Sequence, residues 1–396
     1  MLELDCVLGF DAASDKDFFA ALPARPAVCL IEPKQSSAEP FFIRTQDLRR
    51  RLQRLLGEID ASSKRLNLRE FARGIRFRLT ATSFEQTFVY YQQARQLFPQ
   101  RYQKLLRIRP PAVLKVNLRN AYPRCYATRR IAVDAQREPS GGIYYGPFAS
   151  RKAADAFAES VLDLFKVRRC QIKIRRDPSF PGCIYSEMKM CLAPCFAGCT
   201  KEEYDVEVQQ LVKFLETGGA SLRGTLESER ERASEQLDFE KAALFHKKLD
   251  KLDEALRGQP EMPRRLQDLN AVILQRGGEE QSIAAYEVRS GRIADPFVLA
   301  FSQLAGDPRS AEQIFRQHLE PSDGQLAATP AADLSEHLWL LARWFYSNPR
   351  EGEIFFHANG WPYRRMMRAC SRLLAPPQAQ QAAKPGDPGV EKKELS

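Results

Sequence analysis

The sequence predicts a multidomain α+β protein, and three observations support this prediction. The chain has 396 residues, more than a single hydrophobic core usually organises. Its hydrophobic content of 44% is enough for several sizeable cores. Segments with the alternating pattern of strands are interleaved with segments of helical period. We therefore expect domains at 1–108, 109–219, 220–257 and 266–374, a linker at 258–265, and a disordered tail at 375–396.

The composition favours a cytoplasmic protein with a polyanionic partner. There is no apolar run of the roughly 18 residues that a membrane span needs, so no membrane association is expected. The first residues are acidic where a signal peptide is basic. The formal net charge of +10 favours nucleic acid as the partner, although charge alone is weak support.

The first domain is predicted to be a compact α+β unit with one basic helix. Its expected elements are strand 27–32, strand 40–44, helix 46–57, helix 64–74, strand 75–81 and helix 83–98. Leucines recur at helical spacing along 46–57. The rest of that helix carries Arg49, Arg50, Arg51 and Arg54 with few carboxylates nearby. These arginines form either a solvated face or a phosphate-binding surface, and their density favours the second.

The second domain begins with strands and loops over 109–149, followed by a helix from about residue 150. Aromatic and basic side chains interleave in this region, notably Tyr122, Arg124, Tyr126, Arg129, Arg130, Tyr144 and Tyr145. Such mixing suits nucleic acid, because rings stack on bases while arginines contact phosphates, but an ordinary strand surface looks the same. Arg151 and Lys152 occupy a first helical turn, where the helix dipole prefers anions, so a bound phosphate would fit there.

A cysteine-rich stretch follows, and it is the most specific chemical signal in the chain. Cys170, Cys183, Cys191 and Cys195 are separated by twelve, seven and three residues, and Cys199 lies three residues further on. Four thiolates can hold zinc or an iron–sulfur cluster. Disulfides or scattered core thiols are the weaker alternative, because a reducing compartment is expected. The spacing alone does not decide which metal is bound.

Helices dominate the next part of the chain. Thr200 and Glu203 form a capping box that starts a helix, which Gly218 and Gly219 end. Two helices with a tight join follow, and their apolar spacing of three and four residues is that of a coiled-coil seam. This hairpin completes its core against a partner or, alternatively, against its own chain. Beyond the linker we expect a β-hairpin turning at Ser290-Gly291, helices 309–319 and 333–347, strand 353–358 and a last helix ending at Leu374.

Four landmarks in this order make the chain resemble the UvrC family of excision-repair nucleases, including its shorter Cho-like members. They are the strand–strand–helix start at 22–56, the segment Tyr145-Gly146-Pro147-Phe148 before a helix, the cysteine spacing, and the motif ERASEQLDFEKAA at 231–243. The resemblance covers about residues 20–300. It implies a GIY-YIG-like α/β nuclease fold at the N-terminus, a cysteine-cluster domain, a helical UVR hairpin and an α+β C-terminal domain.

The same resemblance implies that the nuclease chemistry is largely lost. The first family motif stands here as Ala27-Val28-Cys29 and the second as Phe41-Phe42-Ile43, so both tyrosines are replaced. The catalytic arginine is retained as Arg51. The metal-binding glutamate falls at Gln86, and a neutral amide is a poor ligand for Mg²⁺. Arg44 stands for the lysine that follows the second motif, and Gln93 stands for the family asparagine.

The cofactors and partners implied by the resemblance follow the motifs. Cys170, Cys183, Cys191 and Cys195 would ligate a [4Fe–4S] cluster, with zinc possible on chemistry alone. Mg²⁺ or Mn²⁺ would bind only if nuclease activity remains. Phe239 would dock the hairpin on a UvrB-like partner, with Phe245 and Leu249 beside it, unless Phe239 is a core ring. Double-stranded DNA would contact Arg44, Arg49, Arg50, Arg124, Arg151 and Lys152.

Three functions are compatible with these residues. The first is a repair protein that binds DNA and a partner but does not cut. The second is an active endonuclease that uses Glu85, one residue from the expected metal ligand, or another carboxylate. The third is a metal-stabilised interaction protein without a DNA role. The RNase H-like nuclease of full-length family members is expected to be absent, because too few residues follow position 300.

Overall fold

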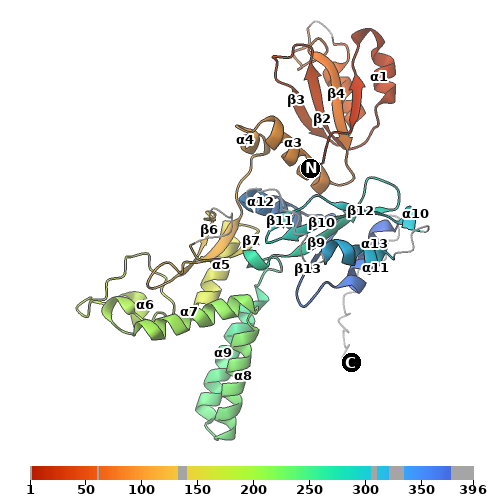
Figure 1. Ribbon diagram of the computed structural model, residues 1–396. Helices are drawn as coiled ribbons and strands as arrows, with labels where there is room; N and C mark the ends of the chain where they lie inside the picture. The colour runs from red at the N-terminus through yellow and green to blue at the C-terminus, as the bar shows by residue number, and fades with distance from the viewer. Residues whose placement is uncertain (1, 60–61, 133–140, 305–309, 321–333, 376–396) are drawn as a thin grey trace, which may run out of the picture.

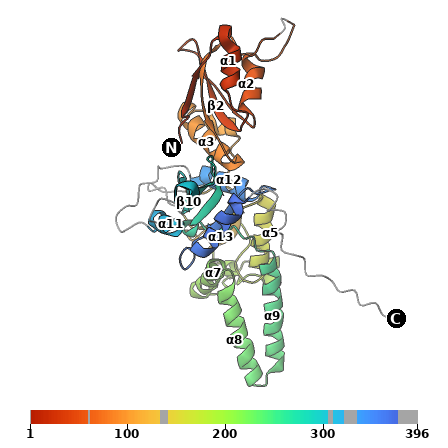
Figure 2. The ribbon, with the colours of Figure 1, turned by 90° about the vertical axis from the view of Figure 1, so that its right-hand side faces the viewer.

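The computed structural model describes residues 2–59, 62–132, 141–304, 310–320 and 334–375. An N-terminal α/β domain lies at one end, and a long helical hairpin projects from the other end (Figures 1 and 2). The middle and C-terminal sheets form the body between them. This mixed α/β organisation confirms the predicted fold class at that level.

The N-terminal domain is a four-stranded antiparallel sheet with helices on both faces. Its strands are β1 Cys6–Gly9, β2 Ala27–Pro33, β3 Phe41–Thr45 and β4 Ala72–Leu79, in the order β1-β4-β2-β3. Helices α1 Asp15–Ala21 and α2 Leu48–Leu56 cover one face, and α3 Ser83–Leu97 covers the other. Residues 1–22 were not assigned any element from the sequence, and they supply β1, α1 and a 3-10 turn at Ala12–Ser14.

The helix predicted at 64–74 does not form, which is the main error in this domain. Residues 64–71 form turns and loops, and the strand begins earlier than predicted, at Ala72. The Asn67 side chain accepts from the backbone N–H of Arg69 and donates to the Gly57 carbonyl. Such side-chain bonds compete with helix formation. Arg69 then fixes the loop through an ion pair with Asp15.

Helix α3 joins the N-terminal domain to the rest of the molecule. Val89 packs on the sheet residues Val28 and Leu30. Phe84, Phe88 and Tyr91 belong instead to the central core with the C-terminal domain. With buried residues on both sides, α3 has little amphipathic pattern of its own. The domain boundary predicted near residue 108 is therefore not a break in packing, because α3 on its N-terminal side shares a core with the C-terminal domain.

The middle domain contains the three predicted strands and one that was missed. They are β5 Ala112–Val116, β6 Cys125–Thr128 and β7 Ile143–Phe148, joined by β8 Arg264–Arg265 in the order β6-β5-β7-β8. Helices α5 Arg151–Leu162 and α7 Lys201–Glu216 pack on this sheet, and the short α6 Ile184–Glu187 lies in the cysteine-rich loop. The predicted linker 258–265 is thus partly a strand. Met262 within it is fully buried, which explains why the segment is held to the core.

The helical hairpin has the predicted form. Helix α8 Ala220–Glu235 and helix α9 Phe239–Arg257 run side by side away from the body (Figure 1). The side chain of Asp238 caps α9 by accepting from the backbone N–H of Lys241 at 3.1 Å. Gly219 has φ 90°, and a Cβ there would stand 2.7 Å from Leu256. Only glycine fits this junction between α7 and α8 without strain.

The C-terminal domain is an antiparallel sheet between two helical layers. Its strands are β9 Ala271–Arg276, β10 Ser282–Arg289, β11 Arg292–Ile293, β12 Phe297–Ala300 and β13 Glu353–Phe356. Its helices are α10 Phe301–Leu304, α11 Ala311–Leu319, α12 Leu334–Phe345 and α13 Tyr363–Leu374. Helix α12 packs on one sheet face together with α3, while α11 and α13 pack on the other. The predicted turn at Ser290-Gly291 joins β10 to β11, with positive φ at both residues.

Two further sequence predictions concern the ends of the chain and the membrane. The tail expected to be disordered lies outside the described residues beyond Ala375. Within the described part of the chain, no helix is both long and apolar enough to cross a bilayer.

Candidate functional site

The position expected for a metal-binding glutamate is occupied by a fully engaged amide. Gln86 lies on α3 and is only 4% exposed. Its Nε2 donates to the carbonyl of Thr45 at 2.8 Å and to that of Ala27 at 3.2 Å, which joins α3 to β3 and β2. A carboxylate at this site would face two carbonyl oxygens without a proton to donate. Gln86 therefore serves packing between helix and sheet, in a form that a glutamate could not replace.

The two positions at which the resemblance predicts tyrosines, Cys29 and Phe41, are also apolar packing positions. Cys29 on β2 is fully buried in the core between the sheet and α1–α2, and burial raises the pKa of its thiol well above the ordinary value. Phe41 on β3 packs against the edge of the same core. Neither side chain can take a proton from water at neutral pH. The predicted loss of these two catalytic groups thus corresponds to two ordinary core contacts.

Glu85, the alternative metal ligand, caps helix α3 instead. Its carboxylate accepts from the backbone N–H of Ala81 at 2.7 Å, while its own N–H donates to the Thr82 hydroxyl at 3.1 Å. The side chain is 8% exposed, and burial raises the pKa of its carboxyl. Because the carboxylate is held at the helix start, it does not point with Gln86 toward β2 and β3.

The predicted arginines on and near α2 have different roles. Arg49 is tied down, because its Nε donates to the Leu22 carbonyl at 2.6 Å and so joins α2 to the end of α1. Arg50 is exposed, and Arg51 is half-buried without a hydrogen bond or ion pair from its guanidinium to any described residue. The structure therefore leaves Arg50 and Arg51, but not Arg49, with donors available for a ligand.

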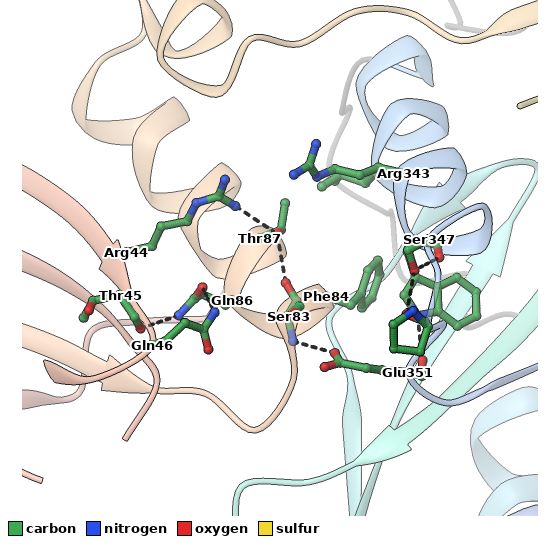
Figure 3. Close-up of a pocket in the computed structure, with 13 residues that line it drawn as sticks. Arg44, Thr45, Gln46, Ser83, Phe84, Gln86, Thr87, Arg343, Ser347 and Glu351 are labelled. Atoms are coloured by element: carbon green, nitrogen blue, oxygen red, sulfur yellow. Dashed lines mark hydrogen bonds between the residues drawn. The ribbon is translucent and has the colours of Figure 1, made fainter. Parts of the chain in front are cut away.

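Arg44 lies apart from that helix, in a groove that the sequence did not reveal. The groove has a volume of about 650 Å³ and separates the N-terminal domain from the C-terminal domain (Figure 3). Its walls come from the end of β3, the first turns of α3, and α12 with the loop after it. Arg343 on α12 faces Arg44 across it. The two residues are separated by nearly three hundred positions, so no local pattern could have paired them.

The predicted nucleic-acid residues of the middle domain show mixed availability. Arg124 stacks over the Tyr126 ring at 4.3 Å, and Arg151 pairs with Asp155 at 2.8 Å within α5. Lys152 is exposed beside it. Tyr144 and Tyr145 are buried core rings. The interleaved pattern is therefore partly a strand surface, with Lys152 and the exposed Arg129 and Arg130 left as cations at the surface.

The cysteine-rich loop contains five free thiols, those of Cys170, Cys183, Cys191, Cys195 and Cys199. All nine cysteines of the chain lie in the described part and are unpaired, so the disulfide alternative fails in this structure. Burial, followed by the charges of Cys170, Cys183 and Cys195, raises the pKa of Cys191 to about 11. Within the described residues, however, no three cysteine, histidine or acidic side chains are close enough to form a metal-binding group. The soft donors suit a metal, and their final arrangement stays a prediction.

Arg168 anchors this loop, and no sequence pattern pointed to this residue. The residue is 5% exposed, with its Nε donating to the Tyr122 carbonyl at 2.8 Å. Its Nη1 donates to the carbonyls of Cys170 and Ile172, and lies 3.8 Å from the Cys170 sulfur. A buried guanidinium at the first cysteine fixes the start of the loop.

The hairpin tip is the main exposed apolar feature of the helical part. Phe239 is 69% exposed, Leu237 is 72% exposed and Leu244 is 52% exposed. Phe239 is therefore not a core ring of the hairpin. Phe245 is half-buried and Leu249 is 6% exposed, because the base of the hairpin packs against the middle domain. At its base, the hairpin thus completes its core against its own chain, and Leu249 is unavailable to a partner. At its tip, Phe239 remains open to a partner.

Comparison with known proteins identifies the middle of the chain. Residues 112–214 match the family model of the UvrC/Cho excinuclease middle domain. This part of the chain is similar to the UvrC family. It is 31% identical to the UvrABC system protein C of Chlamydia caviae over 195 residues, and 27% identical to that of Chlamydia abortus over 287 residues. No solved structure matches significantly.

The UvrC relatives are much longer than the matched region. The similarity to the Chlamydia caviae protein covers 48% of this chain and 31% of the relative. For the Chlamydia abortus protein these shares are 72% and 46%. The chain thus matches less than half the length of these relatives, and their UvrC middle domain coincides with the part that contains the cysteine loop.

Proposed function

We propose that this UvrC-like chain acts in nucleotide excision repair by binding DNA and a UvrB-like partner, without cutting DNA through its N-terminal domain. The repair role follows from the similarity to the UvrC family. The observation that supports the loss of cutting is Gln86, whose amide occupies the expected metal-ligand position and donates to two backbone carbonyls. Mg²⁺ needs carboxylate oxygens that this arrangement does not supply.

The DNA would contact cations that the fold leaves available. The predicted residues whose cationic groups remain available are Arg50 and Arg51 on α2, Arg44 in the groove and Lys152 on α5. Arg49 and Arg151 are engaged within the chain, and Arg124 stacks on Tyr126. Phosphate contacts of this kind release counterions, so affinity should fall steeply as salt rises.

The cysteine loop would hold a [4Fe–4S] cluster through Cys170, Cys183, Cys191 and Cys195. When bound, the cluster would supply a rigid cross-link between loop segments that otherwise have little secondary structure. Arg168 would orient the loop at the first ligand. The exposed tip of the hairpin around Phe239 would bind the partner, because an open apolar surface on projecting helices is typical of a docking site.

An incision assay on anaerobically purified protein tests this function. A lesion-bearing duplex is incubated with Mg²⁺ or Mn²⁺, with and without UvrB, and an absorption spectrum of the same sample reports an iron–sulfur cluster. We expect no nicks and salt-sensitive DNA binding. Metal-dependent nicks that Arg51→Ala abolishes would show an active endonuclease instead. Absent or salt-independent DNA binding would leave a metal-stabilised interaction protein.

A further inference from the structure

The groove between the N-terminal and C-terminal domains contains two arginines that face each other, Arg44 and Arg343. The guanidinium of Arg44 donates to the Thr87 hydroxyl at 3.1 Å and lies over the Tyr90 ring at 5.7 Å. The guanidinium of Arg343 lies 6.0 Å from the centre of the Trp339 ring. Neither arginine forms an ion pair with a residue in the described part of the chain.

These two cations repel each other in the folded protein. Burial, followed by the charge of Arg343, lowers the pKa of Arg44. Both side chains extend toward the same part of the groove, on the side of Thr87 that is remote from Glu351 (Figure 3). Like charges held together in this way would be stabilised by an anion between them.

Several other polar groups of the groove are already engaged, so the two guanidinium groups are its main cationic donors. The hydroxyls of Thr45, Thr87 and Ser347 each donate to a backbone carbonyl. Gln86 is held by its two carbonyl partners. The carboxylate of Glu351 accepts from the backbone N–H of Ser83 at 2.7 Å, which places the acidic group at the opposite end from the arginines.

We propose that Arg44 and Arg343 clamp one phosphate of a DNA strand in this groove. Guanidinium forks match phosphate oxygens geometrically, and each arginine can supply two parallel N–H donors. Because Arg44 belongs to the N-terminal domain and Arg343 to α12, the bound strand would join the two domains. This inference rests on the proposed DNA-binding function and adds the C-terminal domain to the DNA surface.

The test compares the variants Arg44→Gln, Arg343→Gln and their double variant with Arg364→Gln as the matched control. Arg364 is an exposed arginine on α13, which packs on the opposite face of the C-terminal sheet. Binding of a labelled duplex is measured by fluorescence anisotropy over a series of salt concentrations. Thermal unfolding followed by circular dichroism verifies that each variant is folded.

We expect each groove variant to bind DNA about tenfold more weakly than the control, as for a lost hydrogen bond to a charged group. A plot of log affinity against log salt has a negative slope, and its magnitude falls by about 0.9 for each phosphate contact that is lost. If both arginines hold the same phosphate, the double variant should reduce the magnitude of the slope by about 0.9. Two separate phosphates would reduce it by about 1.8. Arg343→Lys should restore part of the affinity by returning the charge.

Three results would overturn the proposal. Groove variants that bind with the affinity and slope of Arg364→Gln would exclude the clamp while leaving the proposed function intact. A slope change of about 1.8 in the double variant would indicate two separate phosphates. Inorganic phosphate that stabilises the wild type but not the groove variants, with DNA binding unaffected, would assign the site to a small phosphate ligand. Wild type without salt-dependent DNA binding would refute the proposed function itself.

Discussion

The N-terminal domain and the cysteine-rich middle domain differ in how their characteristic residues are used. In the N-terminal domain, Gln86 and Cys29 stand where the resemblance predicts catalytic groups, and the fold itself satisfies both side chains. In the middle domain, four cysteines are unpaired thiols in a loop anchored by Arg168. Buried side chains such as Gln86 stabilise the N-terminal domain by their own contacts, whereas the cysteine loop has little core of its own and depends on anchors such as Arg168.

The largest expected effect on stability is that of Gln86→Glu. This variant places a carboxylate at the position where the resemblance predicts a metal ligand, and it tests whether metal-dependent cutting then appears. The new carboxylate would replace a donor to the Ala27 and Thr45 carbonyls in a site only 4% exposed. We expect a loss of about 3 kcal/mol in the free energy of unfolding, because buried polar groups are left unsatisfied. Urea unfolding measures it, with Gln53→Glu on the exposed face of α2 as the control. Unchanged stability together with new Mg²⁺-dependent nicking would contradict the conclusion that Gln86 serves packing in a form that glutamate cannot replace.

A slightly smaller effect is expected from Arg168→Met in the middle domain. The change leaves the carbonyls of Tyr122, Cys170 and Ile172 without their donor, which should cost about 2 kcal/mol. The loop should then be cleaved faster by trypsin, and the iron or zinc content per chain should fall. Arg169→Met is the control, because the ion pair that Arg169 forms within the described residues is with the exposed Asp163. Unaltered metal content would mean that the thiols assemble without this anchor.

The third prediction concerns the contact between α3 and α12, which joins the N-terminal domain to the C-terminal domain. Glu336 on α12 is 2% exposed and accepts from the hydroxyls of Tyr91 at 2.7 Å and Tyr102 at 2.6 Å. Arg95 lies 3.5 Å from the same carboxylate. Glu336→Gln retains the shape but weakens these charge-assisted bonds, so we expect a loss of about 1.5 kcal/mol. Hydrogen exchange should increase in α3 and α12 and stay constant in the hairpin, and a uniform increase would contradict this local role.

The smallest effect on stability is expected at the hairpin tip. Phe239→Ser changes a side chain that is 69% exposed, so the free energy of unfolding should stay within about 0.5 kcal/mol of wild type. Binding to a UvrB-like partner, measured by calorimetry, should nevertheless be lost. Leu249→Ser is the contrasting variant. Because Leu249 is only 6% exposed, this change should lower the free energy of unfolding, which Phe239→Ser should leave nearly unchanged. Undiminished partner binding by Phe239→Ser would move the docking surface elsewhere.

Local patterns were sufficient for much of the chain. Periodicity predicted β5 to β7, α8, α9 and the sheet strands of the C-terminal domain, and the Thr200–Glu203 capping box marked the start of α7. The helix expected at 64–74 failed because Asn67 and Arg69 bond to neighbouring backbone and side chains. The short edge strand β1 and the two-residue β8 were missed because such elements carry almost no periodic signal.

The sequence by itself determined the family resemblance, the presence of four clustered soft ligands, and the absence of the expected tyrosines and glutamate. These properties depend on residue type and spacing, which folding does not change. Only the tertiary structure decided that Gln86 donates to two strands, that Leu249 is buried while Phe239 is exposed, and that Arg44 meets Arg343. Each of these depends on segments distant in the chain, brought together because α3 buries side chains against two domains at once.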